Sequence, residues 1–183
     1  MQEIIKKIRT LEAKGEAPVI VSIEGGAGSG KTTLAAALNK ALGGNLYHMD
    51  DFFLPPHLRT AERLATPGGN VDYERFYEEV VKGIFSGGPF SYGVFDCSVG
   101  EITDSREMQP SALHIVEGVY SAHPHYAEIY SLRIFLDVDG ETQRKRILER
   151  NREKAPMFFD RWIPMENRYF EAYSIREKSD IIL

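Results

Sequence analysis

A glycine-rich loop between a strand-like run and a helix-like run constrains the fold of this chain more than any other feature. Residues 25–32 read GGAGSGKT and match the phosphate-binding pattern G-x-x-x-x-G-K-[ST] at every fixed position. Val and Ile dominate residues 18–23 before the loop, and Ala, Leu and Asn dominate 32–42 after it. Because a strand feeds the loop and a helix starts at its end, backbone N–H groups can converge on phosphate oxygens. The sequence therefore predicts a nucleotide phosphate site here.

The motif also assigns individual roles. Lys31 is expected to reach the β- and γ-phosphates, and the Thr32 hydroxyl is expected to bind Mg²⁺. A glycine-rich turn without a ligand is the alternative, but the full pattern with both flanks correct favours the phosphate site. The residues expected to bind the nucleotide here are Gly26, Ala27, Gly28, Ser29, Gly30, Lys31, Thr32 and Thr33.

Short apolar runs alternate with longer helical patterns along the chain, which predicts an α/β fold of three layers around a mostly parallel sheet. Its 183 residues fit a single domain, 1–183. Strands are expected at 18–23, 45–49, 91–97, 112–116, 132–138 and 180–183, and a loop at 55–69. Helices are expected at about 2–14, 32–42, 72–85 with Asp72 as N-cap, 141–153, and 158–176 with an interruption near Pro164.

Composition limits the partners and the compartment. The net charge of −5 argues against non-specific binding to nucleic acid. The apolar runs are far shorter than the roughly 20 residues that span a bilayer, and residues 1–14 do not form a signal peptide, so we expect a cytoplasmic protein without a membrane partner. The single cysteine, Cys97, excludes an internal disulfide and is expected in the core near the acceptor pocket.

Acidic residues close two of the expected strands. Asp50 and Asp51 follow the strand at 45–49, and Glu117 closes the one at 112–116. Carboxyl ends of parallel strands face the crevice where ligands bind, so one of the two aspartates should lie beside the phosphate loop. Glu117 is expected to hold Mg²⁺, directly or through water. Alternatively, the two aspartates cap a helix or form a turn, and Glu117 lies at a strand end that faces solvent.

An acidic protein that binds phosphate must concentrate its positive charge, and the stretch 144–152 does so. Arg146 and Arg150 are four residues apart and would share one helix face. A lid at about 144–158 that closes over phosphates fits this pattern, whereas a solvated face paired with nearby glutamates is the alternative. The basic residues of the stretch are Arg144, Lys145, Arg146, Arg150 and Arg152.

Several protein classes use such a phosphate loop. A GTPase would carry an N-K-x-D motif late in the chain, which this sequence lacks, and a motor or AAA-type ATPase would normally be longer. A base, a metal site and local positive charge are the groups that phosphoryl transfer requires. The sequence therefore favours a phosphotransferase that acts on a small molecule.

The ordered motifs resemble the uridine kinase family of nucleoside-monophosphate-kinase-like P-loop proteins, which is related to phosphoribulokinase and pantothenate kinase. The resemblance covers most of the chain and rests on GGAGSGKT (25–32), MDDFF (49–53), NVDYERF (70–76), IVEG (115–118), the basic stretch 144–152 and SDIIL (179–183). It implies a P-loop kinase fold with a short lid, ATP or GTP with Mg²⁺ as cofactors, and a nucleoside such as uridine or cytidine as acceptor. A homo-oligomer is left open.

The resemblance also implies roles for matching residues. The family's catalytic base falls on Asp50, its ribose-binding aspartate on Asp72 and its acidic metal-site residue on Glu117. Phe53 stands where a tyrosine is common and is expected to contact substrate within an acceptor region at about 52–100. Lid arginines match Arg146, Arg150 and Arg152, of which Arg150 is expected to act with Lys31 on the transferred phosphoryl group.

The chain departs from the family in the region that recognises the base. Residues 94–100 lack the family's histidine, and 158–164 has no obvious family equivalent. The alternatives are therefore a kinase for pantothenate, a phosphosugar or another metabolite, and a nucleotide-binding regulatory module that has lost transfer. His48 and His114 are expected to pack within strands, and 123–125 is expected to form a surface turn.

Overall fold

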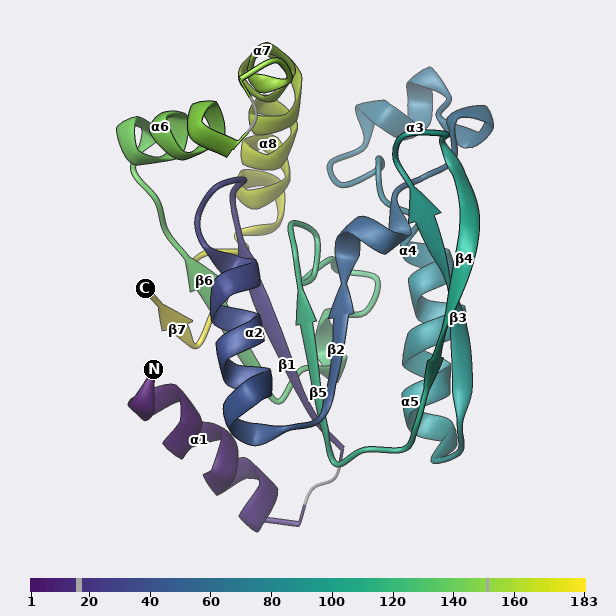
Figure 1. The fold of residues 1–183 in the computed structure, drawn as a ribbon, viewed down its shortest axis with the longest axis vertical. Helices are drawn as coiled ribbons and strands as arrows, with labels where there is room; N and C mark the ends of the chain where they lie inside the picture. Colours follow the sequence, from purple (N-terminus) through teal and green to yellow (C-terminus); the bar gives the residue numbers. More distant parts are fainter. Residues whose placement is uncertain (16–17, 151) are drawn as a thin grey trace.

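A parallel sheet forms the centre of the molecule in the computed structural model, which describes residues 1–15, 18–150 and 152–183 (Figure 1). Its five strands are ordered β2-β5-β1-β6-β7, and every neighbouring pair is parallel. The predicted α/β fold with a mostly parallel sheet is therefore confirmed. The strands are β1 Val19–Gly25, β2 Asn45–His48, β5 Leu113–Glu117, β6 Leu132–Leu136 and β7 Ile181–Ile182.

Helices α1 (Gln2–Ala13) and α2 (Lys31–Leu42) cover one face of the sheet. Side chains alternate between the faces of a strand, so Val21 and Ile23 of β1 point to the same side and pack with Ile8 and Leu38. The apolar spacing that predicted the N-terminal helix places Ile4 and Ile8 in this core, with at most 1% of either residue exposed.

The other face carries an aromatic core, and a continuous helical run from Tyr73 to Ser86 packs into this core beside the hairpin described below. Asp72 caps this run, as predicted, because its side chain accepts the Arg75 N–H. Phe76 from the run packs at 5.0 Å from Phe52, ring centre to ring centre. The run comprises α4 (Tyr73–Phe76), the π-helix η3 (Tyr77–Val81) and α5 (Lys82–Ser86).

An antiparallel hairpin, β3 (Phe90–Asp96) and β4 (Glu101–Met108), stands beside the central sheet rather than within it. Strand β4 was not predicted, because its first seven residues are all exposed and show no apolar alternation. Cys97 lies in the turn of the hairpin and is exposed, so the expectation of a core cysteine is wrong.

Most of the C-terminal third is helical, and its last helix is α8 (Ile163–Tyr173). The helix runs without a break from Ala155 to Tyr173, and the interruption expected near Pro164 is a π-helical turn, η5 (Phe158–Trp162), that directly precedes α8. No helix in the described ranges is both long and apolar enough to cross a membrane.

The remaining elements are α6 (Gly140–Arg150), α7 (Ala155–Met157), α3 (Ala61–Ala65), and the 3₁₀ turns η1 (Met49–Phe52), η2 (Pro56–Leu58) and η4 (Ala127–Ile129).

Candidate active site

The phosphate loop lies where the sequence places it, between the end of β1 and the start of α2. Gly25 has a φ of +140°, and a Cβ there would lie 2.4 Å from the Leu136 carbonyl oxygen, so only glycine fits. Gly30 caps α2 in the left-handed region, with φ +103°. Lys31 folds back over the loop, and its Nζ donates to the Gly26 carbonyl at 2.8 Å. The loop therefore has the backbone conformation of a phosphate loop, and Lys31 lies against it.

The acidic end of β5 meets the start of α2. Thr32 Oγ1 donates to Glu117, 3.3 Å from both carboxylate oxygens. His48, at the end of the adjacent β2, places Nδ1 2.6 Å from Glu117 Oε1. The prediction that His48 only packs is therefore wrong, and its hydrogen bond to Glu117 raises the pKa of His48.

A hydroxyl and a carboxylate are hard oxygen donors of the kind that Mg²⁺ prefers, so Thr32 and Glu117 fit the predicted ion. The described residues form no cluster of three or more His, Cys, Asp or Glu side chains suited to a metal. An ion held by this pair would therefore need phosphate oxygens to complete its coordination, as Mg²⁺ commonly does in nucleotide sites.

Asp50 and Asp51 take different positions. Asp50 is open to solvent on one side, yet desolvation by the surrounding protein and the charge of Glu117 raise its pKa, while Lys31 and Arg150 lower it. Asp51 is buried, and its carboxylate accepts the Tyr92 hydroxyl at 3.3 Å. Asp50 is therefore under the charges of Lys31 and Arg150, and Asp51 anchors the hairpin through Tyr92.

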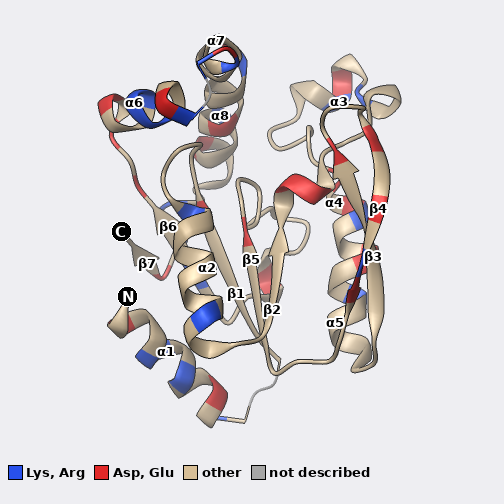
Figure 2. Cartoon of the chain, in the orientation of Figure 1, with Lys and Arg blue, Asp and Glu red and all other residues tan. Residues whose placement is uncertain are grey.

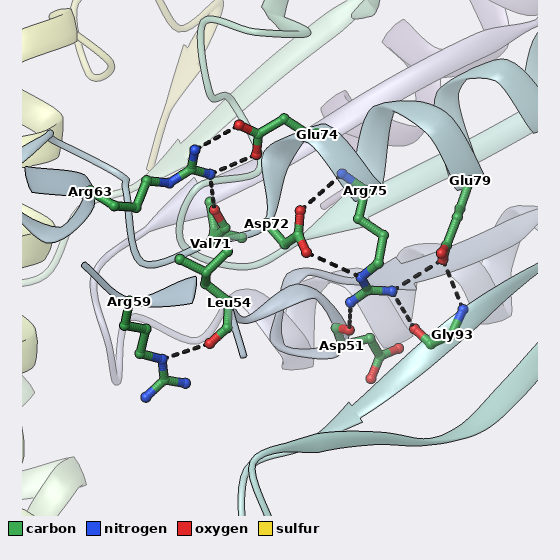
Figure 3. Close-up of polar contacts among 10 residues, drawn as sticks. All are labelled: Asp51, Leu54, Arg59, Arg63, Val71, Asp72, Glu74, Arg75, Glu79 and Gly93. Carbon is green, nitrogen blue, oxygen red and sulfur yellow. Dashed lines mark hydrogen bonds and ion pairs between the residues drawn. The ribbon is translucent and has the colours of Figure 1, made fainter. Parts of the chain in front are cut away.

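Arg75 joins the elements on the acceptor side of the site (Figure 3). Its Nη2 donates to the Asp51 carbonyl at 2.6 Å, and its Nη1 donates to the Gly93 carbonyl of the hairpin at 2.8 Å. Its Nε lies 3.7 Å from Asp72 Oδ2. Asp72 is thus held by its own helix end and by Arg75, and its role in sugar binding stays a prediction.

An aromatic pair spans the acceptor side and the C-terminal helices. The ring of Phe53, just after η1, lies 6.4 Å from the Trp162 ring at the end of η5. The Arg161 guanidinium lies 5.0 Å from the same Trp162 ring. The segment 158–164, which the motifs did not explain, therefore reaches Phe53, a predicted substrate contact.

Helix α6 lies directly against the phosphate loop. Gln143 Nε2 donates to the Ala27 carbonyl at 2.9 Å, and Arg146 Nη1 donates to the Gly28 carbonyl at 3.0 Å. Arg150, one turn further on, is close enough to Asp50 to lower its pKa. Arg152 is exposed in the turn that follows. Figure 2 shows basic residues concentrated on α6, so the structure brings Arg146 and Arg150 to the site.

A shallow groove of about 450 Å³ runs along the outer side of the phosphate loop. It is open to solvent next to the loop and to Arg146, which suits the base and sugar of a nucleotide whose phosphates lie in the loop. Its lining residues are Ser29, Leu136, Asp137, Val138, Asp139, Thr142, Arg146 and Leu183.

Two buried carboxylates of the site were missed by sequence reasoning. Glu24, the residue before Gly25, accepts the N–H groups of Tyr120 and Ala122 at 3.2 and 3.1 Å and the Tyr169 hydroxyl at 3.2 Å. A charged residue at the end of an apolar strand was the signal that could have revealed it. Glu166 in α8 accepts the Ala27 N–H, and no local pattern marks it.

The expectation of a surface turn at 123–125 is wrong for its first residue. His123 is only 5% exposed and stacks on Tyr73, with 4.3 Å between ring centres. Burial lowers its pKa to about 4. His123 is therefore a neutral packing residue, whereas His125 is exposed.

These buried carboxyls predict how stability depends on pH. Burial raises the pKa of Glu24 and Glu166 from 4.5 to about 7, so the folded state keeps protons there that the unfolded chain releases. Each protonated carboxyl adds roughly 3 kcal/mol to the free energy of unfolding. This stabilisation is complete below pH 4.5 and is lost as the pH rises through 7. His123 has the opposite effect: its pKa is lowered, so the free energy of unfolding rises as the pH rises from 4 to 6.5.

The difference between wild type and Glu166→Gln isolates one of these groups. We expect urea unfolding to show the variant gaining stability relative to wild type from pH 5 to pH 8. A difference that stays constant over this range would contradict the raised pKa of Glu166.

Comparisons with known proteins agree with the fold. No family model matches the chain. A uridine kinase of Clostridium perfringens is 24% identical over 185 residues, which cover 91% of this chain and 86% of the relative. A uridine kinase of Geobacillus kaustophilus is 26% identical over 188 residues, which cover 92% of this chain and 87% of the relative.

Solved structures share the fold. A protein described as a possible uridine kinase from Bacillus stearothermophilus superposes with a TM-score of 0.70 at 18% identity, covering 99% of each chain. A protein described as a fructose transport system kinase, from Silicibacter sp. TM1040, reaches 0.64 at 20% identity and covers 92% of this chain and 90% of its own. The fold and the site thus define a P-loop protein of the kinase type. The resemblance predicted from the motifs is confirmed: the chain is similar to proteins named uridine kinase over about nine-tenths of its length, and it has the fold of P-loop kinases.

Proposed function

We propose that this protein is an ATP-dependent kinase that transfers the γ-phosphoryl group to a hydroxyl of a small molecule, with a nucleoside such as uridine or cytidine as the acceptor. One observation carries the proposal: Lys31 lies in the phosphate loop, Thr32 hydrogen-bonds Glu117 at the start of α2, and the charges of Lys31 and Arg150 act on Asp50. The uridine kinase names of the sequence relatives support the nucleoside as acceptor.

In the proposed mechanism, the loop amides and Lys31 hold the nucleotide phosphates, and the base and sugar lie in the groove beside Ser29 and Arg146. Thr32 and Glu117 would hold Mg²⁺ together with phosphate oxygens. The ion would supply charge neutralisation on the phosphates.

Asp50 accepts the proton of the acceptor hydroxyl as that oxygen attacks the γ-phosphorus and the bond to the β-phosphate oxygen breaks. A raised pKa makes Asp50 a better proton acceptor than an ordinary aspartate, provided that it is ionised at the working pH. Lys31 and Arg150 stabilise the charge on the phosphoryl group in transit.

We propose that the acceptor binds in the space bounded by Asp50, Asp72 and Phe53. We also propose that the chain forms one kinase domain over 1–183. The acceptor region then spans about 52–100 and the lid about 144–158. Trp162, whose ring contacts that of Phe53, adds a second aromatic surface beside it, and such surfaces suit stacking by the planar base of a nucleoside.

A second class of acceptor is favoured by one observation. Arg106 of β4 lies 3.7 Å from Asp51 and its side chain is 44% exposed, so a guanidinium faces the acceptor side in place of the missing histidine. Such a group suits an acceptor with a phosphate or carboxylate, such as a phosphosugar or pantothenate.

A panel of hydroxyl acceptors with γ-labelled ATP separates these classes. We expect uridine or cytidine to give the highest kcat/KM, at least about tenfold above neutral sugars. A phosphosugar or pantothenate as the best acceptor would replace the nucleoside assignment, and ATP binding without transfer to any acceptor would favour a regulatory module.

A further inference from the structure

Glu166 places a carboxylate inside the phosphate loop. Its Oε2 accepts the Ala27 N–H at 2.9 Å, and only 7% of the residue is exposed. In loops of this type, backbone N–H groups are the donors that bind phosphate oxygens. One donor of the loop is therefore occupied by a carboxyl group that belongs to the protein itself.

The lid and α8 hold the same loop residue from two sides. Gln143 of α6 donates to the Ala27 carbonyl at 2.9 Å, while Glu166 of α8 accepts from the Ala27 N–H. A Cβ on the neighbouring Gly26 would lie 2.9 Å from Gln143 Nε2 and 3.6 Å from Glu166 Oε2. Both helices are thus in close contact with the phosphate loop (Figure 1).

The groups around Glu166 are those that the proposed function assigns to the terminal phosphate. Lys31 of α2 and Asp50 of η1 both lie within electrostatic range of its carboxylate, as does Tyr120 from the segment after β5. In the proposed function, the γ-phosphoryl group must lie between the loop and Asp50, because the base has to reach the attacking hydroxyl. Glu166 hydrogen-bonds the loop through the Ala27 N–H, and the charge of Asp50 acts on its carboxyl group.

We propose that Glu166 is a specificity-determining residue that competes with the terminal phosphate of the nucleotide, so that a triphosphate must displace it whereas a diphosphate need not. The inference rests on the proposed function, since it assumes that the loop binds nucleotide phosphates. An ionised carboxylate and a γ-phosphate on the same side of Lys31 repel each other, and the repulsion is strong where water is excluded. A diphosphate lacks the group that would meet Glu166.

Displacement of Glu166 would move α8 and, with it, the adjoining Trp162. Trp162 is the only tryptophan of the chain and lies 6.4 Å from Phe53. Its fluorescence should therefore change when ATP binds and change less when ADP binds.

The test measures the dissociation constants of ATP and ADP, by calorimetry at pH 8, for wild type, Glu166→Gln and Glu171→Gln; burial raises the pKa of Glu166 to about 7, so its carboxyl is ionised at this pH. Glutamine can still accept the Ala27 N–H but carries no charge. Glu171 lies on the same helix and is exposed, so its replacement is the matched control. We expect Glu166→Gln to bind ATP about tenfold more tightly and ADP within about twofold of wild type, and Glu171→Gln to match wild type for both.

An unchanged or weaker ATP affinity in Glu166→Gln, or an equal gain for ADP, would overturn the inference. If Glu166→Gln does not fold, the wild-type fluorescence decides: equal Trp162 responses to ATP and ADP would also overturn it. Wild type that binds neither nucleotide would instead contradict the proposed function, so the two failures are distinguishable.

Discussion

Asp50→Asn is expected to lower the kcat of acceptor phosphorylation by about 10²- to 10⁴-fold, the range usual for loss of a general base. The amide cannot accept the hydroxyl proton, although it has nearly the same size. ATP affinity should stay within about threefold of wild type, because Asp50 contributes none of the backbone donors of the phosphate loop. The measurement is kcat with the best acceptor, together with the dissociation constant of ATP.

Asp104→Asn is the matched control, since Asp104 is an exposed aspartate of β4. It should leave both quantities unchanged. If Asp50→Asn retained more than about a third of wild-type kcat while ATP still bound, the base would have to be another group. Asp51 is a poor substitute, because its carboxylate is buried against Tyr92.

Lys31→Met should reduce kcat/KM by about 10²- to 10³-fold, which is the usual effect of removing one group that stabilises transition-state charge. Methionine keeps the length and apolar character of the side chain but loses the ammonium group. It also loses the Nζ donor to the Gly26 carbonyl, so ATP affinity should fall as well. The effect is measured as kcat/KM for ATP at saturating acceptor.

Lys40→Met serves as its control, because Lys40 is an exposed lysine at the other end of α2. It should behave as wild type. A Lys31→Met variant with unimpaired transfer would show that the loop holds phosphate through backbone groups alone.

Local patterns in the sequence predicted much of this fold. Glycines 25 and 30, the β-branched run before them and the helix after them act over short distances, so their consequences can be read without the tertiary structure. The same holds for Asp72, whose capping of the next helix is a local hydrogen bond. Glu117 and Thr32 came together because both lie at the carboxyl-end edge of a parallel sheet, which the motifs already located.

Contacts between distant segments were not predictable in this way. Glu166 reaches Ala27 across 139 positions of the chain, and only the packing of α8 against the phosphate loop brings them together. The exposure of Cys97 follows from the hairpin, whose second strand is too polar to be recognised. His48 was treated as a packing residue because its partner, Glu117, lies on a different strand.

Transfer of labelled phosphate from γ-³²P-ATP tests the central claim most directly. Wild type is incubated with labelled ATP and Mg²⁺, with and without uridine or the best acceptor of the panel, and the products are separated by anion exchange. We predict that the label moves to the acceptor, one phosphorylated product for each ADP formed, and that Asp50→Asn abolishes most of this transfer. Label that stays in ATP or appears only as inorganic phosphate, with nucleotide demonstrably bound, would contradict the account.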